Sequence, residues 1–376
     1  MKKSRKDKPC VAHYASSYLP LTENWIYRIL IHHVSYTPIF LSRRKENLSL
    51  FPISTLFSLQ DFRILRQYVE ILLFRILGYF FFMKKVCVQN NTEILHVHFG
   101  YHGVKMLGLK RRLKVPMICS FYGDDAFAYG AVKYKRLFKD VEKVLVLGPY
   151  MKSRLISLGC KESKISIHHL GIDVEIIPFK RRHVHKGTSI KFLIASSFLE
   201  KKGIDLAIKA IRKFKDEFEF TLDIIGDGPL REDIVNLIAE SDLAGRVKLH
   251  GYKPYDYFIE LASRCDVFIQ ASRTADGNKK EGTPMAIVDA MATGMAVIST
   301  MHSDIPEIVV DGFTGFLAKE NDVRTLEECF HKIFDYPERI GEFGEVGRER
   351  VEKEFNAKVQ TTKLENIYNE LLASGN

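Results

Sequence analysis

The sequence predicts an α/β protein made of two successive doubly wound domains. Its 376 residues are enough for two domains, and with 46% hydrophobic and 27% charged residues the chain can bury sizeable cores. Short apolar runs alternate with helical patterns along the chain, which is typical of parallel sheets covered by helices. The polar, basic segment FKRRHVHKGTS (179–189) separates two such series, and we interpret it as the linker between the domains.

The first series begins with the strand-like segment CVAHYA (10–15), followed by a loop and a helix from about residue 24. Two further strand-like segments end in glycine-containing loops, which are the breaks expected between a strand and a helix. The later strand-like segments of this series are EILHVHFG (93–100), VPMICSFYG (115–123), KVLVLG (143–148) and KISIHHLGID (164–173).

Between these strands, ILRQYVEILLFRILGYFFFM (64–83) predicts an apolar, aromatic-rich helix. Its charged side chains leave an unbroken apolar run that is too short to span a bilayer. Residues 1–180 hold 29 Lys and Arg against 13 Asp and Glu, whereas residues 181–376 hold 27 against 33. This imbalance, with Lys84 and Lys85 behind the helix, favours contact with an anionic membrane surface. No signature of a nucleic-acid-binding module is present, so we expect no nucleic-acid partner.

The second series contains three strand–helix pairs before the next strand-like segment, CDVFIQAS (265–272). The pairs are SIKFLIAS with helix 203–216, FTLDIIGDGPL with helix 230–241, and RVKLHGY with helix 255–263. IIGDGPL lacks the third glycine of a dinucleotide-binding turn, so we interpret it as a tight strand-to-helix turn. GFLA (315–318) is the last strand-like segment, and a final helix is expected at about 356–371. We therefore expect domains at residues 1–180 and 181–355, with a C-terminal helix in 356–376 that packs back on the first.

The segment EGTPMAIVDAMATG (281–294) predicts a helix, with Thr283 as a suitable N-cap and Pro284 suited to the first helical position. The loop before it lies at the carboxyl end of a strand, where α/β sheets bind ligands. Two interpretations of its acids are open from these residues alone. Glu281 and Asp289 are either an acidic helix start and a solvated side chain, or two acids of a binding site.

The six cysteines show no metal-type spacing, and we interpret them as the reduced thiols of a cytosolic protein. No cluster of metal ligands is visible in the sequence. No metal and no cofactor are therefore expected.

The order of motifs along the chain resembles that of the retaining, nucleotide-sugar-dependent glycosyltransferases of family 4, also called group 1. In the carboxyl-terminal half the matching segments are EKKGIDLAIKA (200–210), IIGDGPLRE (224–232), LHGY (249–252), EGTPMAIVDAMATGMAVIST (281–300) and HSDIPEIVVDGFTGFLA (302–318). In the amino-terminal half they are YLPLTENW (18–25), HVHFG (96–100), SFYGDDA (120–126) and LGIDVE (170–175). The motifs of the amino-terminal half look most like those of the subgroup that builds exopolysaccharide, capsule or O-antigen repeats. The resemblance implies a GT-B fold, in which two Rossmann-like domains face each other across a cleft.

The resemblance places the donor, a UDP- or GDP-sugar, in the carboxyl-terminal domain. Glu281 and Asp289 occupy the two acidic positions of the family's E-x7-E motif, which implies that Glu281 faces the donor sugar and Asp289 the ribose. Asp289 stands where the family has Glu, so we expect a longer, water-bridged or re-aimed ribose contact. The segment where sugar hydroxyls and phosphate oxygens are held corresponds to Gly282, Thr283, Pro284 (which has no N–H) and Met285.

The family's diphosphate clamp pairs an Arg with a Lys in a G-R-x-x-x-x-K-G pattern, and the corresponding segment here is SSFLEKKG (196–203). Lys202 matches the Lys, whereas Ser197 stands in the place of the Arg. A Lys binds phosphate as a point charge but makes no bidentate fork. Lys201 and Arg273 are the candidates to make up this deficit. Gly251 of LHGY is a further donor-binding position that the resemblance implies.

The resemblance assigns the acceptor to the amino-terminal domain, where SFYGDDA replaces the family's H-G-x-D pattern. Tyr122 stands in the place of the His near the scissile bond, and Asp125 matches the Asp; both are expected at the catalytic centre. The family needs no obvious protein nucleophile, because the leaving diphosphate helps to deprotonate the acceptor hydroxyl on the same face. His98 is either an acceptor-binding residue or a satisfied core histidine. Thr22 and Asn24 are the other acceptor-binding positions expected.

We therefore expect a retaining, hexosyltransferase-type glycosyltransferase that moves a sugar to a lipid-linked or growing glycan in cell-surface polysaccharide biosynthesis. Electrostatic stabilisation of the leaving diphosphate would carry most of the catalysis. The expected location is the cytoplasm, peripheral at the inner face of the plasma membrane. Two alternatives stay open. One is a non-catalytic or degenerate partner subunit, favoured by the lost Arg and His, and the other is a sugar-nucleotide epimerase on the same fold, for which no acid–base constellation is visible.

Overall fold

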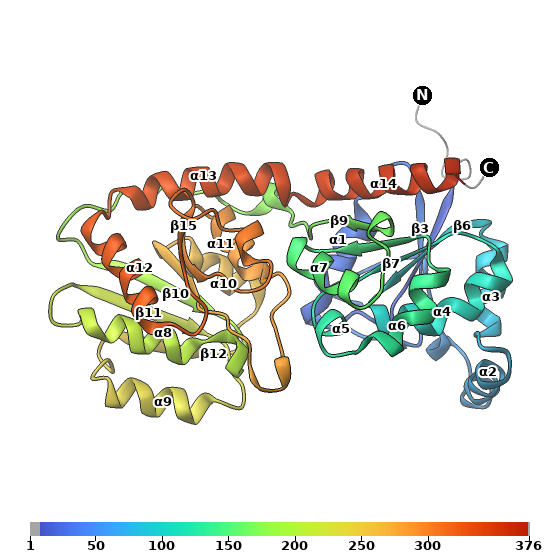
Figure 1. Cartoon of the computed structure of the whole chain (residues 1–376), viewed down its shortest axis with the longest axis horizontal. Helices are drawn as coiled ribbons and strands as arrows, with labels where there is room; N and C mark the ends of the chain where they lie inside the picture. Colours follow the sequence, from blue (N-terminus) through green and yellow to red (C-terminus); the bar gives the residue numbers. More distant parts are fainter. Residues whose placement is uncertain (1–7, 375–376) are drawn as a thin grey trace. The chain divides into compact units, whose positions relative to one another are not determined.

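The computed structural model describes residues 8–374, which divide into two compact units (Figure 1). The first unit runs to Gly171 and resumes at Ala357, and the second spans Ile172 to Asn356. Each unit is built on its own parallel sheet, which confirms the predicted α/β class with two doubly wound sheets. No helix within residues 8–374 is long and apolar enough to cross a membrane.

Within the described residues, the sheet of the first unit has seven parallel strands in the order β5-β3-β1-β6-β7-β8-β9. The order reverses between β1 and β6, and the carboxyl ends of strands at such a switch point are where α/β sheets bind ligands. The strands are β1 (Cys10–Tyr14), β3 (Thr37–Ser42), β5 (Leu56–Ser58), β6 (Thr92–His98), β7 (Met117–Ser120), β8 (Lys143–Val146) and β9 (Ile165–Ile167), with a separate ribbon of β2 (Ser17–Tyr18) and β4 (Arg44–Lys45). The helices are α1 (Asn24–Ile31), α2 (Ile64–Leu77), α3 (Phe81–Gln89), α4 (Gly100–Leu113), α5 (Asp124–Phe127), α6 (Ala131–Asp140), α7 (Pro149–Ser157) and α14 (Ala357–Ser374).

The sheet of the second unit, in the part of the chain that is described, has six parallel strands in the order β12-β11-β10-β13-β14-β15. Alternate side chains of β10 enter opposite cores: Phe192 and Ile194 pack in one and Leu193 in the other. The strands are β10 (Ile190–Ala195), β11 (Phe220–Ile225), β12 (Val247–Gly251), β13 (Val267–Gln270), β14 (Ala296–Thr300) and β15 (Gly315–Ala318). The helices are α8 (Ile204–Ile211), α9 (Arg231–Glu240), α10 (Tyr255–Ala262), α11 (Met285–Ala292), α12 (Val323–Asp335) and α13 (Arg339–Glu354).

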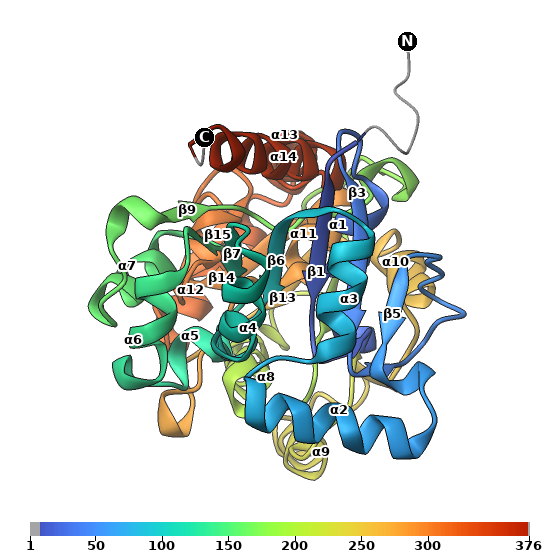
Figure 2. The same ribbon diagram turned by 90° about the vertical axis from the view of Figure 1, so that its right-hand side faces the viewer.

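The apolar segment 64–83 forms the two helices α2 and α3, and the prediction of a single helix was wrong. α2 ends at Leu77 because Gly78 adopts a left-handed conformation, with φ of 76°. Phe82 and Met83 of α3 are buried, so this part of the segment belongs to the core. Figure 2 shows α2 along the outside of the first unit, where it packs against α3.

The chain enters the second unit at Ile172, earlier than the expected boundary at residue 180. The reason is burial, because Ile172 and Ile177 are part of a hydrophobic core of the second unit. The segment 179–189, interpreted as a linker, therefore lies inside that unit. The chain leaves again at Asn356, which forms a parallel bridge with Ile172, so the two crossings lie side by side.

The helices α12 and α13 were not anticipated from the sequence. The final helix, α14, corresponds to the segment expected at 356–371 and belongs to the first unit. Its side chains Leu364 and Tyr368 are fully buried in a core that also contains Val11 of β1 and Ile94 of β6. The helix α14 is thus part of the first unit, although it follows the second unit in the sequence.

Candidate functional site

The loops at the carboxyl edge of the second sheet bring together Lys202 and Glu281. The Nζ atom of Lys202 lies 2.5 Å from Oε2 of Glu281, and the two side chains are 15% and 12% exposed. Burial raises the pKa of Glu281, but the charges of Lys202 and Lys201 outweigh this effect and hold the pKa below its ordinary value. The residues that the resemblance assigns to the donor sugar and to its diphosphate therefore form one ion pair.

Glycine is needed where the loop carrying Lys202 meets the strand β13. Lys202 ends a short 3-10 helix, η6 (Glu200–Lys202), and Gly203 behind it has φ of 63°. A Cβ atom on Gly203 would lie 1.8 Å from the carbonyl oxygen of Ala271, so any larger residue would push the loop off the strand end. This close approach sets the position of Lys202.

A buried histidine, His302, fixes the loop that carries Glu281. The Glu281 N–H donates to Nε2 of His302 at 3.0 Å, so Nδ1 carries the proton and donates to Oε2 of Glu320 at 2.9 Å. Burial lowers the pKa of His302, and the nearby Glu320 carboxylate opposes this only in part. Glu320 also accepts the N–H of Thr274 at 2.5 Å, so a single carboxylate ties three loops together.

Neither of these supporting contacts was predicted from the sequence. His302 lies in one of the segments that resemble the family, but no contact was predicted for it. Glu320 was not singled out from the sequence. The only signal is positional: each residue follows one of the neighbouring strands β14 and β15, which pair in parallel and therefore end at the same edge of the sheet.

Asp289 is buried on α11, which excludes the interpretation of a solvated helix side chain. It is 6% exposed, and its Oδ1 accepts the hydroxyl of Tyr255 at 2.7 Å. The helix begins at Met285 with Pro284 as its cap, one residue later than predicted from Thr283, because Pro284 is still extended. The carboxylate of Asp289 is therefore held in place by a side chain of the neighbouring helix α10.

The other donor-binding candidates lie around this edge. Gly282 and Thr283 form the loop between Glu281 and α11, whereas Ser197 is exposed in the loop after β10. Lys201 directs its Nζ to the carbonyl of Lys280 at 3.5 Å. The carbonyl of Gly251 accepts the N–H of Gly226 at 2.9 Å and so links the ends of β12 and β11.

The side chain of Arg273 is engaged by Glu200 and Asp205. Its Nε donates to the carbonyl of Glu200 at 3.1 Å, and its Nη1 lies 3.2 Å from Oδ2 of Asp205. Its backbone N–H also donates to the carbonyl of Lys201. These contacts fix η6 against the loop after β13, so we assign Arg273 a positioning role in place of the phosphate contact considered from the sequence.

In the first unit, Asp125 organises the loop after β7. Its Oδ2 accepts the N–H of Gly100 at 2.8 Å, and its Oδ1 accepts those of Tyr122 and Gly123, each at 3.0 Å. Burial raises the pKa of Asp125 to about 6, against the lowering effect of these donors. Both oxygens accept backbone N–H groups, so Asp125 fixes the loop that carries Tyr122, and its catalytic role stays a prediction.

His98 is a satisfied core histidine that joins Tyr122 to further buried histidines. It is fully buried, and burial lowers its pKa to about 3, so the ring is neutral. Its Nδ1 lies 2.6 Å from the hydroxyl of Tyr122, and its Nε2 lies 3.1 Å from Nδ1 of His13. Burial and these contacts favour the interpretation of His98 as a satisfied core histidine.

The rings of His13, His96 and His98 each bring one ligand atom within 4.8 Å of the others, a separation that a metal ion could bridge. The rings of His96 and His98 are stacked, however, at 24° with centroids 4.6 Å apart, so their lone pairs do not converge on one point. Both nitrogens of His96 are also hydrogen-bonded, to Tyr368 at 2.6 Å and Ser120 at 2.7 Å. The arrangement fits a hydrogen-bonded network better than a metal centre.

Thr22 and Asn24, the other acceptor-binding candidates, flank Glu23 at the start of α1. Thr22 is exposed and Asn24 is half-buried. Glu23 was not singled out from the sequence, yet burial and the charge of Glu46 raise its pKa to about 7. Burial raises the pKa of Tyr122; a side-chain hydrogen bond with Ser120 opposes this rise, and the charges of Asp125 and, to a smaller extent, Glu23 add to it. A carboxyl that titrates near neutrality at a ligand-binding edge is a candidate base.

Comparison with known proteins assigns both units. Residues 176–350 match the family "Glycosyl transferases group 1", and residues 57–176 match "Glycosyltransferase Family 4". The amylovoran biosynthesis glycosyltransferase AmsK of Erwinia amylovora is 33% identical over 74% of this chain and 70% of its own length. The putative colanic acid biosynthesis glycosyltransferase WcaL of Escherichia coli K12 is 30% identical over 76% of this chain and 73% of its own.

Solved structures agree on the fold. A glycosyltransferase from Rickettsia africae ESF-5 superposes with a TM-score of 0.77 at 17% identity, over 97% of this chain and 99% of its own. HepE from Anabaena, in complex with UDP and glucose, superposes with a TM-score of 0.74 at 14% identity, over 96% of this chain and 100% of its own. With two Rossmann-like sheets of the GT-B type and a relative at 33% identity, this chain belongs to the family 4, group 1 glycosyltransferases.

Proposed function

We propose that this protein transfers a sugar from a UDP- or GDP-sugar to a lipid-linked or growing glycan, with retention of the anomeric configuration, in cell-surface polysaccharide biosynthesis. The observation that carries the proposal is the Lys202–Glu281 ion pair at the carboxyl edge of the second sheet. The relatives AmsK and WcaL, named for amylovoran and colanic acid biosynthesis, support the polysaccharide assignment. The complex of HepE with UDP and glucose supports a nucleotide-sugar donor.

The chemistry of the pair suits a departing diphosphate. When the donor binds, its diphosphate replaces the carboxylate of Glu281 as the partner of Lys202, and Glu281 becomes available to accept hydrogen bonds from sugar hydroxyls. As the glycosidic bond breaks, negative charge grows on the diphosphate, and the ammonium of Lys202 stabilises it in a partly buried site. Asp289 binds the ribose hydroxyls from the position that Tyr255 fixes. We expect no metal in these steps.

A second candidate is a degenerate transferase that binds a donor without turning it over. The observation that favours it is the clamp: Ser197 replaces the Arg, and the guanidinium of Arg273 is engaged by Asp205 and Glu200. Lys202 is then the principal side-chain cation for two phosphates. Nothing in the described residues offers the acid–base pair of a sugar-nucleotide epimerase at this edge, so we do not pursue that alternative.

The exposed face of α2 supports a place at the membrane surface. Ile64, Leu65, Tyr68, Val69, Leu72 and Ile76 recur every three to four residues and are 46% to 77% exposed. Arg63, Arg66 and Arg75 are exposed on the same helix or at its start. An apolar face bordered by cations is the pattern of a helix that lies in the headgroup region of an anionic leaflet. We propose that α2 brings the enzyme to the inner face of the plasma membrane, where a lipid-linked acceptor is presented.

Release of free nucleoside diphosphate from a panel of UDP- and GDP-sugars tests the function. We expect one donor to be turned over by the wild-type protein and by Glu232→Gln, an exposed control on α9, but not by Glu281→Gln. Tight binding of a nucleotide sugar without turnover, in the presence of membrane extract as the source of acceptor, would establish the degenerate alternative instead.

A further inference from the structure

An unpaired arginine, Arg43, lies at the carboxyl edge of the sheet in the first unit. It directly follows the last residue of β3 and is half-buried. Its Nε atom is buried without a hydrogen-bond partner, and its guanidinium forms no ion pair with any residue in 8–374. A buried donor without a partner costs free energy, so an arginine in this state is suited to a ligand that accepts hydrogen bonds.

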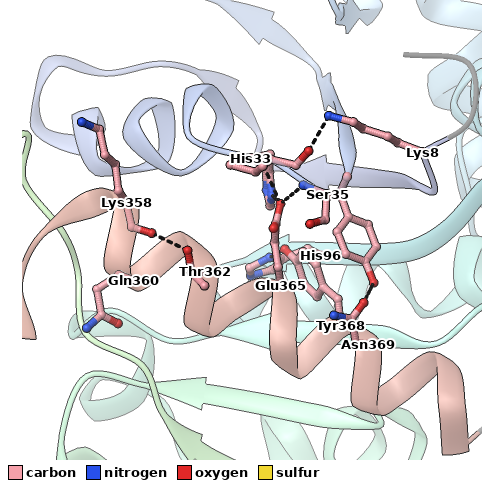
Figure 3. Close-up of polar contacts among 12 residues, drawn as sticks. Lys8, His33, Ser35, His96, Lys358, Gln360, Thr362, Glu365, Tyr368 and Asn369 are labelled. Carbon is pink, nitrogen blue, oxygen red and sulfur yellow. Dashed lines mark hydrogen bonds and ion pairs between the residues drawn. The ribbon is translucent and has the colours of Figure 1, made fainter. Parts of the chain in front are cut away.

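Glu365 of α14 shows how the fold surrounds a charged group that it uses for its own stability. Figure 3 shows its side chain directed toward His33 and Ser35. Its Oε1 accepts the N–H groups of Val34 at 2.8 Å and Ser35 at 2.9 Å, and it lies 3.1 Å from Nδ1 of His33. In the described part of the chain, no such set of partners surrounds the guanidinium of Arg43. The difference indicates that the charge of Arg43 serves a ligand and not the fold.

Two further cations, Lys105 and Lys133, lie near Arg43. Burial lowers the pKa of Lys105, and the charges of Arg43 and Lys133 lower it further. Both lysines are exposed, and none of the three cations forms an ion pair with an acid among the described residues. Like charges that are gathered without a counter-charge repel one another, and a bound anion relieves that repulsion.

The charge of Arg43 lies close to the switch point between β1 and β6. Burial raises the pKa of Tyr14, the last residue of β1, and the charge of Arg43 opposes this rise. Burial also lowers the pKa of His102, in the first turn of α4 after β6, and the charges of Lys105 and Arg43 add to that lowering. The strands β3, β1 and β6 are neighbours in the sheet. Arg43 and Lys105 therefore lie at the edge where α/β sheets bind ligands.

A pair of aromatic rings joins Arg43 to the helix α2. The guanidinium carbon of Arg43 lies 5.8 Å from the centroid of the Phe80 ring. Phe80 in turn stacks on Phe74 of α2, with the centroids 4.5 Å apart and the rings at 21°. The exposed face of α2 is apolar, and it includes Leu72 and Ile76. Unpaired cations next to an apolar helix fit a ligand that carries an anionic group on a lipid chain.

We propose that Arg43 and Lys105 bind the phosphate or diphosphate group of a lipid-linked glycan acceptor in the first unit. The planar guanidinium of Arg43 donates hydrogen bonds to the phosphate oxygens, and the ammonium of Lys105 adds a point charge. The inference rests on the proposed function and names the part of the acceptor that the first unit recognises. No bond is made or broken at this site, so its role is binding.

Isothermal titration calorimetry with farnesyl diphosphate, a short lipid diphosphate, tests the site without any turnover. We expect Arg43→Gln to raise the Kd about 10- to 100-fold, as for the loss of hydrogen bonds to a charged group. Arg43→Lys should recover part of the affinity, because it keeps the charge and loses the fork. Lys105→Gln, at an exposed position where the substitution leaves the core untouched, should raise the Kd about 3- to 10-fold.

Two variants and two ligands serve as controls. Lys143→Gln removes a cation from the start of β8, at the opposite edge of the same sheet, and should bind farnesyl diphosphate like the wild type. Lys202→Ala should do so as well, because the ligand occupies the first unit and not the donor site. Farnesol and inorganic pyrophosphate should each bind more weakly than farnesyl diphosphate, since one lacks the anion and the other the lipid chain.

The alternative ligands give different results. Unchanged affinity in both Arg43→Gln and Lys105→Gln would overturn the inference, and so would a loss of affinity in Lys202→Ala. Pyrophosphate that binds as tightly as farnesyl diphosphate would identify a free anion as the ligand in place of a lipid. Arg43→Gln should co-sediment with phosphatidylglycerol vesicles like the wild type, whereas weaker co-sedimentation would assign Arg43 to bulk phospholipid.

The outcomes also separate this site from the function on which it rests. A protein that turns over a nucleotide sugar but does not bind farnesyl diphosphate would overturn the site and leave the proposed function standing. Binding that depends on Arg43, in a protein without turnover on any donor, would overturn the proposed function and leave a lipid-phosphate site.

Discussion

Replacing Asp289 or Glu281 by its amide should give two different defects, one in nucleotide binding and one in turnover. Asp289→Asn removes the charge that accepts from Tyr255 and brings an NH₂ donor into a site that is 6% exposed. A ribose hydroxyl that donated to the carboxylate then meets a weaker acceptor or a competing donor. Loss of a hydrogen bond to a buried charged group costs about 1–3 kcal/mol, so the Kd of the free nucleoside diphosphate should rise about 5- to 150-fold.

Glu281→Gln should leave the affinity for the free nucleoside diphosphate nearly unchanged, because the hydroxyls that Glu281 binds are on the missing sugar. Its loss should appear in turnover of the intact donor. Isothermal titration calorimetry on both variants compares the two effects directly. Asp233→Asn, which changes an exposed acid on α9, is the matched control and should bind like the wild type. Equal affinity of the wild type and Asp289→Asn would refute the reasoning and reduce Asp289 to a residue that packs α10 on α11.

Lys202→Ala should lower transfer by about 10²-fold, whereas Arg273→Lys should retain most of it; an inactive Arg273→Lys beside a fully active Lys202→Ala would reverse our assignment of the clamp. Leu65→Gln with Leu72→Gln should weaken co-sedimentation with anionic vesicles, which salt should also weaken; equal binding to neutral vesicles would argue against the α2 surface. Prolonged chelation should leave turnover unchanged. A loss of turnover that one added metal restores would contradict this prediction. The pKa of Glu365 lies at about 2 in the folded protein, below the ordinary 4.5, so its contribution to stability is complete above about pH 4.5 and lost as the pH falls toward 2. Glu365→Gln should flatten that fall in melting temperature, and an unchanged pH profile would show that the carboxylate is not the group responsible.

The sequence predicted the sheets better than the helices that close them. Strands such as CVAHYA and SIKFLIAS are short apolar runs with few alternatives, and both lie at the switch points of their sheets. The prediction of one helix over 64–83 was wrong because the apolar run continues across Gly78 without a visible break. In the structure, the left-handed backbone of Gly78 ends the helix at Leu77. The domain boundary was placed near residue 180 because the polar segment that follows was interpreted as a linker, whereas it is a loop of the second unit. The true boundary depends on the burial of Ile172 and Ile177, whose packing partners are far away in sequence.

Of the residues expected at the donor site, the structure brings Lys202 and Glu281 together, whereas the residues that support them were not predicted. Spacing and the resemblance identified Glu281 and Lys202, but spacing does not report that their side chains meet. His302 and Glu320 act through a backbone N–H and a loop, and such contacts depend on where three strand ends lie relative to one another. The contact between His33 and Glu365 could not be predicted for the same reason, since the two residues lie 332 positions apart.

Because α14 belongs to the first unit, the unit that is synthesised first is not the unit that can complete its fold first. Residues 172–356 form a continuous stretch, so the second unit is complete as soon as that stretch leaves the ribosome. The first sheet emerges earlier yet waits for the last helix, because Tyr368 fills its core and Glu365 holds the turn at Val34 and Ser35. A nascent chain stalled before residue 357 would thus carry a finished second unit and an open first one. Chaperones that recognise exposed apolar surface would meet this protein at its amino-terminal half until the residues of α14 have been synthesised.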